Sequence, residues 1–272
     1  MHLALNDKTY IMGILNVTPD SFSDGGKFLD KEDAVRRAIK MTGEGADIID
    51  VGGESTRPGA GDISPEEELN RVIPVIEMLF KRTDIPISID TRRSKVAQRA
   101  LNAGASIVND VSGLRYDPMM AHVVADLEAS LIVMHMKGSP KDMQRSPRYK
   151  DLIGEIRKSL KESLKIAGKA GVRKEKIIVD PGIGFGKTVE HNLAILKNLA
   201  EFKSLGQAIC IGTSRKSFIA KTLGLSQNDS RLYGTLATCV VAIMNGANIL
   251  RVHDVKEAVD VARMTDKILC QN

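Results

Sequence analysis

Residues 85–110 read IPISIDTRRSKVAQRALNAGASIVND, and this stretch carries the pattern that predicts the fold. A short apolar run at 85–90 ends in an aspartate, a segment with helical character follows, and a second apolar run at 106–110 ends in Asn-Asp. Runs that are apolar on both faces are typical of parallel strands covered by helices. The stretch therefore predicts one strand–helix–strand unit.

The same unit recurs outward in both directions along the chain. Apolar runs that end in polar residues lie at 10–16, 47–52, 85–90, 106–110, 130–135, 176–180, 207–212 and 248–253. Eight repeats in about 250 residues match a closed α/β (β/α)₈ TIM barrel. A doubly wound open sheet is the alternative, but it usually has fewer strands, and no GxGxxG motif follows the first run. We expect a single barrel domain over residues 1–272.

Helix signals separate several of these runs. An amphipathic pattern over 33–45 ends at a glycine. Ser64-Pro65-Glu66-Glu67 combines an N-cap serine, a proline at the first helical position and acids near the positive end of the helix dipole. Further helices are predicted over 149–171 and 254–269. Strands that alternate with helices favour a parallel sheet.

The composition excludes several classes of protein. Hydrophobic residues make up 43% of the 272 residues and charged residues 27%, as in a globular protein rather than a disordered one. The 39 Lys and Arg against 34 Asp and Glu give a net charge of +5 without basic runs, which argues against a nucleic-acid partner. No apolar run approaches the ~20 residues of a membrane span. We expect no membrane association.

Cysteine usage and the N-terminus indicate the compartment. Cys210, Cys239 and Cys270 are odd in number, far apart and without CxxC spacing, so a disulfide framework or a structural zinc site is not expected. The first eight residues are too few and too polar for a signal peptide. These features predict a cytoplasmic protein.

Polar residues at the strand ends predict the position of a functional site. In a barrel the C-terminal strand ends converge on one face, which is where barrel enzymes place their chemistry. Loops 18–26, 55–64 and 137–148 would project from that face. The strand ends offer two kinds of group: donors at Arg57, Arg215, Lys216, Arg251 and His253, and acceptors at Asp90, Asn109 and Asp180. Such a set predicts a ligand with an anionic, phosphate-like end and a nitrogen heterocycle that donates hydrogen bonds.

Simpler roles are open for each residue taken alone. Asp90 and Asp180 could cap the helices that follow them, and Arg57 could be a solvated surface charge. His135 is more consistent with a structural hydrogen-bonding group beneath the ligand than with a catalytic group.

Four motifs resemble those of the dihydropteroate synthases, a pterin-binding barrel family. They are GILNVTPDSFSDGG at 13–26, DVGGESTRPG at 50–59, DPGIGFGK at 180–187 and SRKSF at 214–218. Asn-Asp at 109–110 and Arg-Val-His at 251–253 complete the resemblance in chain order. Together these motifs cover the chain from the first strand to the last.

The resemblance implies an activity and partners. Such an enzyme condenses 6-hydroxymethyl-7,8-dihydropterin diphosphate with 4-aminobenzoate in folate biosynthesis, requires Mg²⁺ and is a target of sulfonamides. It also implies a homodimer formed through the later helices, and the apolar stretch 233–247 is a candidate for that interface. No covalent intermediate and no nucleophilic residue are expected.

The resemblance also implies roles for individual residues. The pterin set is Asp90, Asn109, Asp180 and Lys216. The diphosphate set is Asn16, Arg57, Arg251 and His253, and Mg²⁺ would be held by Asn16 and Asp24. The 4-aminobenzoate set is Thr56, Pro58, Phe185 and Ser217, with Lys216 shared. Asn16, Asp24, Arg57, Lys216, Arg251 and His253 are the catalytic set.

Two rival functions follow from the same pattern. A methyltetrahydrofolate-dependent corrinoid methyltransferase would share Asp90, Asn109 and Asp180 but would have little use for the anion-binding groups near strands two, seven and eight. An inactive pterin-binding paralogue would be expected to have lost diphosphate or loop residues, and none of those named above is missing.

Overall fold

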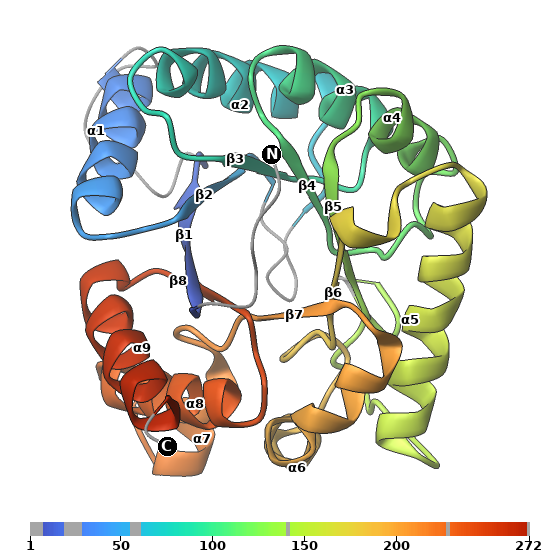
Figure 1. Cartoon of the computed structure of the whole chain (residues 1–272), viewed down its shortest axis with the longest axis vertical. Coiled ribbons are helices and arrows are strands. Elements are labelled where there is room, and N and C mark those ends of the chain that lie inside the picture. The colour runs from blue at the N-terminus through green and yellow to red at the C-terminus, as the bar shows by residue number, and fades with distance from the viewer. Residues whose placement is uncertain (1–7, 19–28, 55–60, 140–141, 227–228, 271–272) are drawn as a thin grey trace.

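The computed structural model is a closed barrel of eight parallel strands surrounded by helices, as the sequence predicted (Figure 1). It describes residues 8–18, 29–54, 61–139, 142–226 and 229–270. Each strand pairs with the next one in the chain, and β8 closes the ring by pairing with β1. The strands are β1 (Tyr10–Asn16), β2 (Ile48–Gly52), β3 (Ile87–Asp90), β4 (Ile107–Asp110), β5 (Ser130–Met134), β6 (Ile177–Asp180), β7 (Ala208–Ile211) and β8 (Ile249–Val252).

The helices form the outer layer of the barrel (Figure 1). They are α1 (Leu29–Gly43), α2 (Pro65–Phe80), α3 (Ser94–Asn102), α4 (Met120–Asp126), α5 (Leu152–Lys169), α6 (Val189–Lys197), α7 (Ser217–Leu223), α8 (Leu232–Met244) and α9 (Val255–Leu269). Two 3₁₀ segments, Lys174–Lys176 and Leu199–Leu205, precede β6 and β7. Within the described residues, no helix is long and apolar enough to cross a membrane.

Two separate apolar cores hold the barrel together. The larger one fills the space between the strands and the helices. The smaller one fills the barrel interior with inward-facing side chains from seven strands: Met12, Ile48, Ile107, Ile132, Ile178, Cys210 and Ile249. The barrel is therefore packed through its middle, and space for a ligand is confined to its ends.

The residues of this interior layer also indicate which side chains form the next layer toward the C-terminal strand ends. Side chains two residues apart on a strand point to the same face. Two residues after Ile48, Ile107, Ile178 and Ile249 come Asp50, Asn109, Asp180 and Arg251. A polar layer thus lies directly on the apolar one, at the C-terminal end of the barrel.

The predicted helices are present, and their starts agree with the structure to different degrees. Ser64 caps α2, since its hydroxyl accepts from the Glu67 N–H at 3.1 Å. The helix predicted from residue 149 instead begins after Asp151, whose carboxylate accepts from the Gly154 N–H. The helix predicted over 33–45 runs over Leu29–Gly43. Six of the predicted strands are shorter by one or two residues at the start, and β5 and β8 end before His135 and His253.

Candidate active site

Three charged side chains and one amide, from four strands, form the centre of the candidate site. Arg251 donates from Nε to Asp50 at 2.6 Å and from a terminal nitrogen to Asp90 at 2.7 Å. The amide of Asn109 donates to the same oxygen of Asp50 at 3.1 Å. The Asp50 side chain is fully buried, while those of Asp90 and Arg251 are 10% and 22% exposed. The barrel therefore brings Asp90, Asn109 and Arg251 together, as predicted.

Burial sets the charge state of this group. It raises the pKa of Asp90 to about 7, with Arg251 acting to lower it and Asp50 to raise it further. Burial lowers the pKa of Arg251, but Asp50 and Asp90 raise it by more, so the pKa ends above its usual value. Arg251 is therefore a permanent cation next to a carboxyl group that can exchange a proton near neutral pH.

Asp50 is a site residue that the sequence analysis left without a role. Its carboxylate accepts hydrogen bonds from both Arg251 and Asn109, so it orients a cation and an amide at once. The sequence feature that could have identified Asp50 is its position two residues after the buried Ile48, because this spacing places its side chain on the inward face of β2.

Asp180 ends β6 and lies at the start of a tight glycine turn. Its carboxylate accepts from the Gly182 N–H at 2.6 Å. Gly182 has a φ of +74°, and a Cβ there would lie 1.9 Å from the carbonyl oxygen of His135, so only glycine fits. Burial raises the pKa of Asp180, while Lys216, the Gly182 N–H and Lys187 act to lower it. Asp180 is thus a buried acceptor held beside two lysines.

Lys216 connects the β6 turn to the start of α7. Its ammonium donates to the carbonyl of Ile183 and lies 4.7 Å from the centre of the Phe185 ring. Burial lowers the pKa of Lys216 to about 8, and the Asp180 carboxylate acts in the opposite direction. Ser217 is exposed and is the first residue of α7, as predicted. Lys216 and Phe185 therefore lie together at one edge of the site, and Ser217 follows Lys216 directly in the chain.

Lys187 is a second site residue that the sequence analysis did not identify. It is 3% exposed and its ammonium contacts Nδ1 of His135 and the carbonyl of Phe185, both at 3.0 Å. Burial lowers the pKa of His135 to about 3, so the imidazole is neutral across the physiological range. Its position under the β6 turn fits the structural role expected for His135.

The loops after β7 and β8 place the remaining donors. The hydroxyl of Ser214 lies 2.9 Å from Nδ1 of His253. The guanidinium of Arg215, which the sequence analysis grouped with the donors, is turned to Asp254 instead. The structure therefore brings His253 to the strand ends and engages Arg215 elsewhere.

The other predicted residues belong to the first two loops. Asn16 ends β1, is half-buried, and lies beside Gly52 and Asp90. Asp24, Thr56, Arg57 and Pro58 lie outside the described residues.

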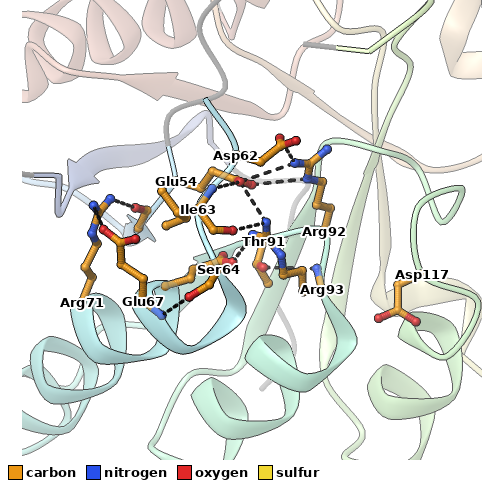
Figure 2. A network of polar contacts seen from close by, with 12 residues as sticks. Glu54, Asp62, Ile63, Ser64, Glu67, Arg71, Thr91, Arg92, Arg93 and Asp117 are labelled. Atoms are coloured by element: carbon orange, nitrogen blue, oxygen red, sulfur yellow. Dashed lines mark hydrogen bonds and ion pairs between the residues drawn. The ribbon is translucent and has the colours of Figure 1, made fainter. Parts of the chain in front are cut away.

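Two arginines after β3 hold the flanks of the segment 55–60 (Figure 2). The carboxylate of Glu54 accepts from Arg93 at 3.0 Å and from Arg92 at 3.3 Å. Arg92 also donates to Asp62 at 2.7 Å, and Arg93 donates to the carbonyl of Ile63 at 2.8 Å. Both flanks of that segment are therefore attached to the strand end that carries Asp90.

Metal-binding side chains do not cluster in the described part of the chain. Over those residues, no group of three or more His, Cys, Asp or Glu is arranged to hold a metal ion.

The chain matches the family described as pterin binding enzyme over residues 12–253. It is 49% identical over 261 residues to a protein of Synechocystis named dihydropteroate synthase, covering 96% of this chain and 90% of that one.

Solved structures resemble it equally closely. One is a dihydropteroate synthase from Clostridium difficile, solved in the presence of pteroic acid; identity is 49%, the TM-score is 0.93, and 99% of this chain and 100% of that one are covered. Another is the Yersinia pestis dihydropteroate synthase with a sulfonamide drug complex, at 40% identity, a TM-score of 0.92 and complete coverage of both chains.

Proposed function

The chain belongs to the pterin binding enzymes and, within them, to the dihydropteroate synthases, and we propose how its strand-end residues divide the two substrates between them. The enzyme joins 6-hydroxymethyl-7,8-dihydropterin diphosphate to 4-aminobenzoate and releases pyrophosphate. The observation that carries the assignment of roles is the polar layer of Asp50, Asp90, Asn109, Asp180 and Arg251 on top of a packed barrel interior.

The pterin ring binds in this layer, between Asp90 and Asn109 on one side and Asp180 and Lys216 on the other. Asp180 accepts from the amino group and the neighbouring ring N–H, since a carboxylate has acceptor oxygens for both. Lys216 donates to the acceptor edge of the ring. Asp180→Asn replaces one acceptor with a donor that faces N–H groups, so pterin affinity should fall at least tenfold in a calorimetric titration. Unchanged affinity would remove Asp180 from the site.

The diphosphate binds toward β8 and the first two loops. Arg251 is charged at every accessible pH, and its fork suits phosphate oxygens. Arg57, from outside the described residues, would be a second cation, and the imidazole of His253 would add a hydrogen-bonding group. The fixed charges of the two arginines stabilise the departing pyrophosphate, whose negative charge grows as the bond breaks.

4-Aminobenzoate binds along Phe185, Lys216 and Ser217, with Thr56 and Pro58 contributed by the second loop. The ring of Phe185 and the stem of Lys216 provide apolar surface for an aromatic ring, and the ammonium provides charge for its carboxylate. A sulfonamide, which mimics 4-aminobenzoate, should compete for this place.

The chemistry needs positioning more than a reactive side chain. The bond between the pterin methylene carbon and the diphosphate oxygen breaks, and pyrophosphate leaves with the electron pair. The neutral amine of 4-aminobenzoate forms the new C–N bond and then loses a proton. Because the amine is already neutral at pH 7, no strong base and no covalent intermediate are required.

The residues at the diphosphate end fit a magnesium ion. Asn16 ends β1 with an amide oxygen, and Asp24, outside the described residues, would add a carboxylate; such oxygen donors together with phosphate oxygens suit Mg²⁺. When bound, the ion would neutralise charge on the diphosphate and help it to leave.

An apolar groove on the outside of the barrel supports a homodimer. The groove has a volume of about 360 Å³ and is lined by Leu193, Leu196, Lys197, Ala237, Thr238, Val241 and Asn245 from α6 and α8. Tyr233 and Met244 on α8 are also largely exposed. Large exposed apolar side chains on one face are typical of an interface. The α8 side of the groove belongs to the stretch 233–247 that the sequence analysis named as a candidate interface, whereas its α6 side lies outside that stretch.

We further propose that residues 1–272 form one domain and that the enzyme is cytoplasmic. All three cysteines are free thiols, two of them buried, which suits a reducing compartment.

The first experiment measures pyrophosphate release from the pterin diphosphate with Mg²⁺, with and without 4-aminobenzoate. Release that requires 4-aminobenzoate and yields 7,8-dihydropteroate supports the proposal. Pterin binding without turnover would contradict it, and corrinoid-dependent methyl transfer would then be tested.

A further inference from the structure

The loops that follow β7 and β8 are joined by two independent side-chain contacts. In the first, the hydroxyl of Ser214 contacts Nδ1 of His253 at 2.9 Å and accepts from the backbone N–H of His253 at 3.1 Å. In the second, Arg215 and Asp254 form a two-point ion pair, with Nε donating to one carboxylate oxygen at 3.1 Å and a terminal nitrogen donating to the other. Two consecutive residues of one loop thus contact two consecutive residues of the other.

Both residues of the ion pair have a locally unfavourable arrangement: Asp254 does not cap its own helix, and Arg215 has a left-handed backbone conformation. Asp254 is the N-cap residue of α9, but its side chain makes no capping hydrogen bond because both oxygens face Arg215. Arg215 has a φ of +57°, a left-handed conformation that is uncommon for residues other than glycine. Unfavourable local choices that converge on one contact are typical of functional sites.

The backbone of Arg215 is secured by its own neighbours. Its N–H donates to the hydroxyl of Thr235 at 3.1 Å, and its carbonyl accepts from Arg231 at 2.8 Å. The left-handed conformation is therefore fixed by α8 and the segment before it, and it directs the guanidinium toward Asp254.

The Arg215–Asp254 ion pair lies between the two halves of the proposed site. Arg215 directly precedes Lys216, whose ammonium lies beside Phe185 and the β6 turn. Asp254 directly follows His253, and Arg251 lies two residues before that. The ion pair between residues 215 and 254 therefore connects the loop that carries Lys216 to the loop that carries His253.

We propose that the Arg215–Asp254 ion pair is a positioning device that aligns His253 with Lys216 for the departure of pyrophosphate, and that Arg215 is not itself a diphosphate ligand. The proposal rests on the proposed function and adds two residues to it. Ser214 assists from the other contact, because its hydroxyl holds the imidazole of His253 in one orientation. Neither Arg215 nor Asp254 needs to contact substrate.

Asp254→Ser removes the ion pair with Arg215 but keeps a residue that can cap α9. Serine is a preferred N-cap residue, so α9 keeps a capping side chain while Arg215 loses its partner. We expect an unchanged or higher melting temperature, and pterin affinity within twofold of the parent enzyme. Pyrophosphate with Mg²⁺ should bind about threefold more weakly, and kcat should fall about tenfold, because alignment matters most where charge develops.

Two further variants serve as controls. Asp151→Ser is the same substitution at the N-cap of α5, where the carboxylate caps its own helix and lies outside the site, so its kcat should equal that of the parent. Arg215→Lys keeps the charge but loses the fork, and should have a kcat between those of the parent and Asp254→Ser.

The outcomes separate the alternatives. If Arg215 were a diphosphate ligand, freeing it in Asp254→Ser would strengthen pyrophosphate binding, and that result would overturn the proposal. A kcat within twofold of the parent, or a loss matched by a fall in melting temperature, would also overturn it. Failure of the parent enzyme to release pyrophosphate with 4-aminobenzoate would instead count against the proposed function.

Discussion

Individual residues in this site differ from their ordinary chemistry because the barrel buries them. Lys216 and His135 are both basic and both lie near the β6 turn, yet their pKa values lie on opposite sides of neutral pH. Burial lowers the pKa of Lys216 only to about 8, with Asp180 supporting the charge, and lowers that of His135 to about 3. Lys216 is therefore a charged hydrogen-bond donor near neutral pH, whereas the imidazole of His135 is uncharged there.

Pterin binding should weaken in alkaline solution because of Lys216. The ammonium is present below a pKa of about 8 and is lost as the pH rises through that value. Pterin affinity should therefore fall about tenfold per pH unit above 8, as measured by calorimetric titration between pH 6.5 and 9.5. In Lys216→Arg the guanidinium stays charged, so the alkaline decline should disappear even if affinity is lower throughout. A parent profile that is flat up to pH 9.5 would exclude this role.

At the scale of single elements, α2 and α3 are joined by buried charge rather than by apolar packing alone. Arg93, just before α3, donates to Glu54 after β2 (Figure 2). Arg93 also donates to Glu68 on α2. Glu68 is fully buried, and burial raises its pKa while Thr91 and Arg93 act to lower it. The network both secures the helices and holds the flanks of the second loop.

Arg93→Ala should destabilise the protein strongly. It leaves the Glu68 carboxyl group buried without its ionic partner, which costs about 3 kcal/mol of unfolding free energy in urea denaturation. Adding Glu68→Gln should recover part of the loss, because a neutral amide removes the unpaired charge. Arg82→Ala breaks an exposed pair with Glu32 and should leave the urea midpoint unchanged. Equal effects of Arg82→Ala and Arg93→Ala would contradict the importance of burial.

At the scale of the whole molecule, the buried apolar cores differ in role from the apolar groove on the outside of the barrel. The interior layer and the layer under the helices are closed to solvent and hold the fold. The groove is lined by residues of α6 and α8, two helices of the outer layer of the barrel (Figure 1). This groove is the surface that we propose as the homodimer interface.

Val241→Asp should therefore produce monomers. The side chain is 41% exposed on α8 within the groove, and a charge there opposes burial of the groove in an interface. Light scattering should give twice the 29.6 kDa chain mass for the parent and a single chain mass for the variant. Ile39→Asp, at 37% exposure on α1, is the matched control and should remain dimeric. A parent mass of one chain would exclude the homodimer.

Much of this protein could be predicted from local sequence. Apolar runs with polar ends predicted the eight strands, and the barrel placed Asp90, Asn109, Asp180 and Arg251 at one end. Ser64 predicted the start of α2 because a cap is a contact between residues three apart. Patterns of this kind are readable because strand period and capping depend only on neighbours in the chain.

Tertiary structure alone decided which charged groups pair. Arg251 contacts Asp50 and Asp90, which lie 201 and 161 residues away, because closure of the barrel brings β8 beside β1 and close to β2 and β3. Arg215 resembles a substrate ligand in the sequence but faces Asp254, 39 residues on, and Lys187 is buried against His135. Each choice of partner depends on the geometry of several elements at once, whereas the pattern along one strand carries information only about its own two faces.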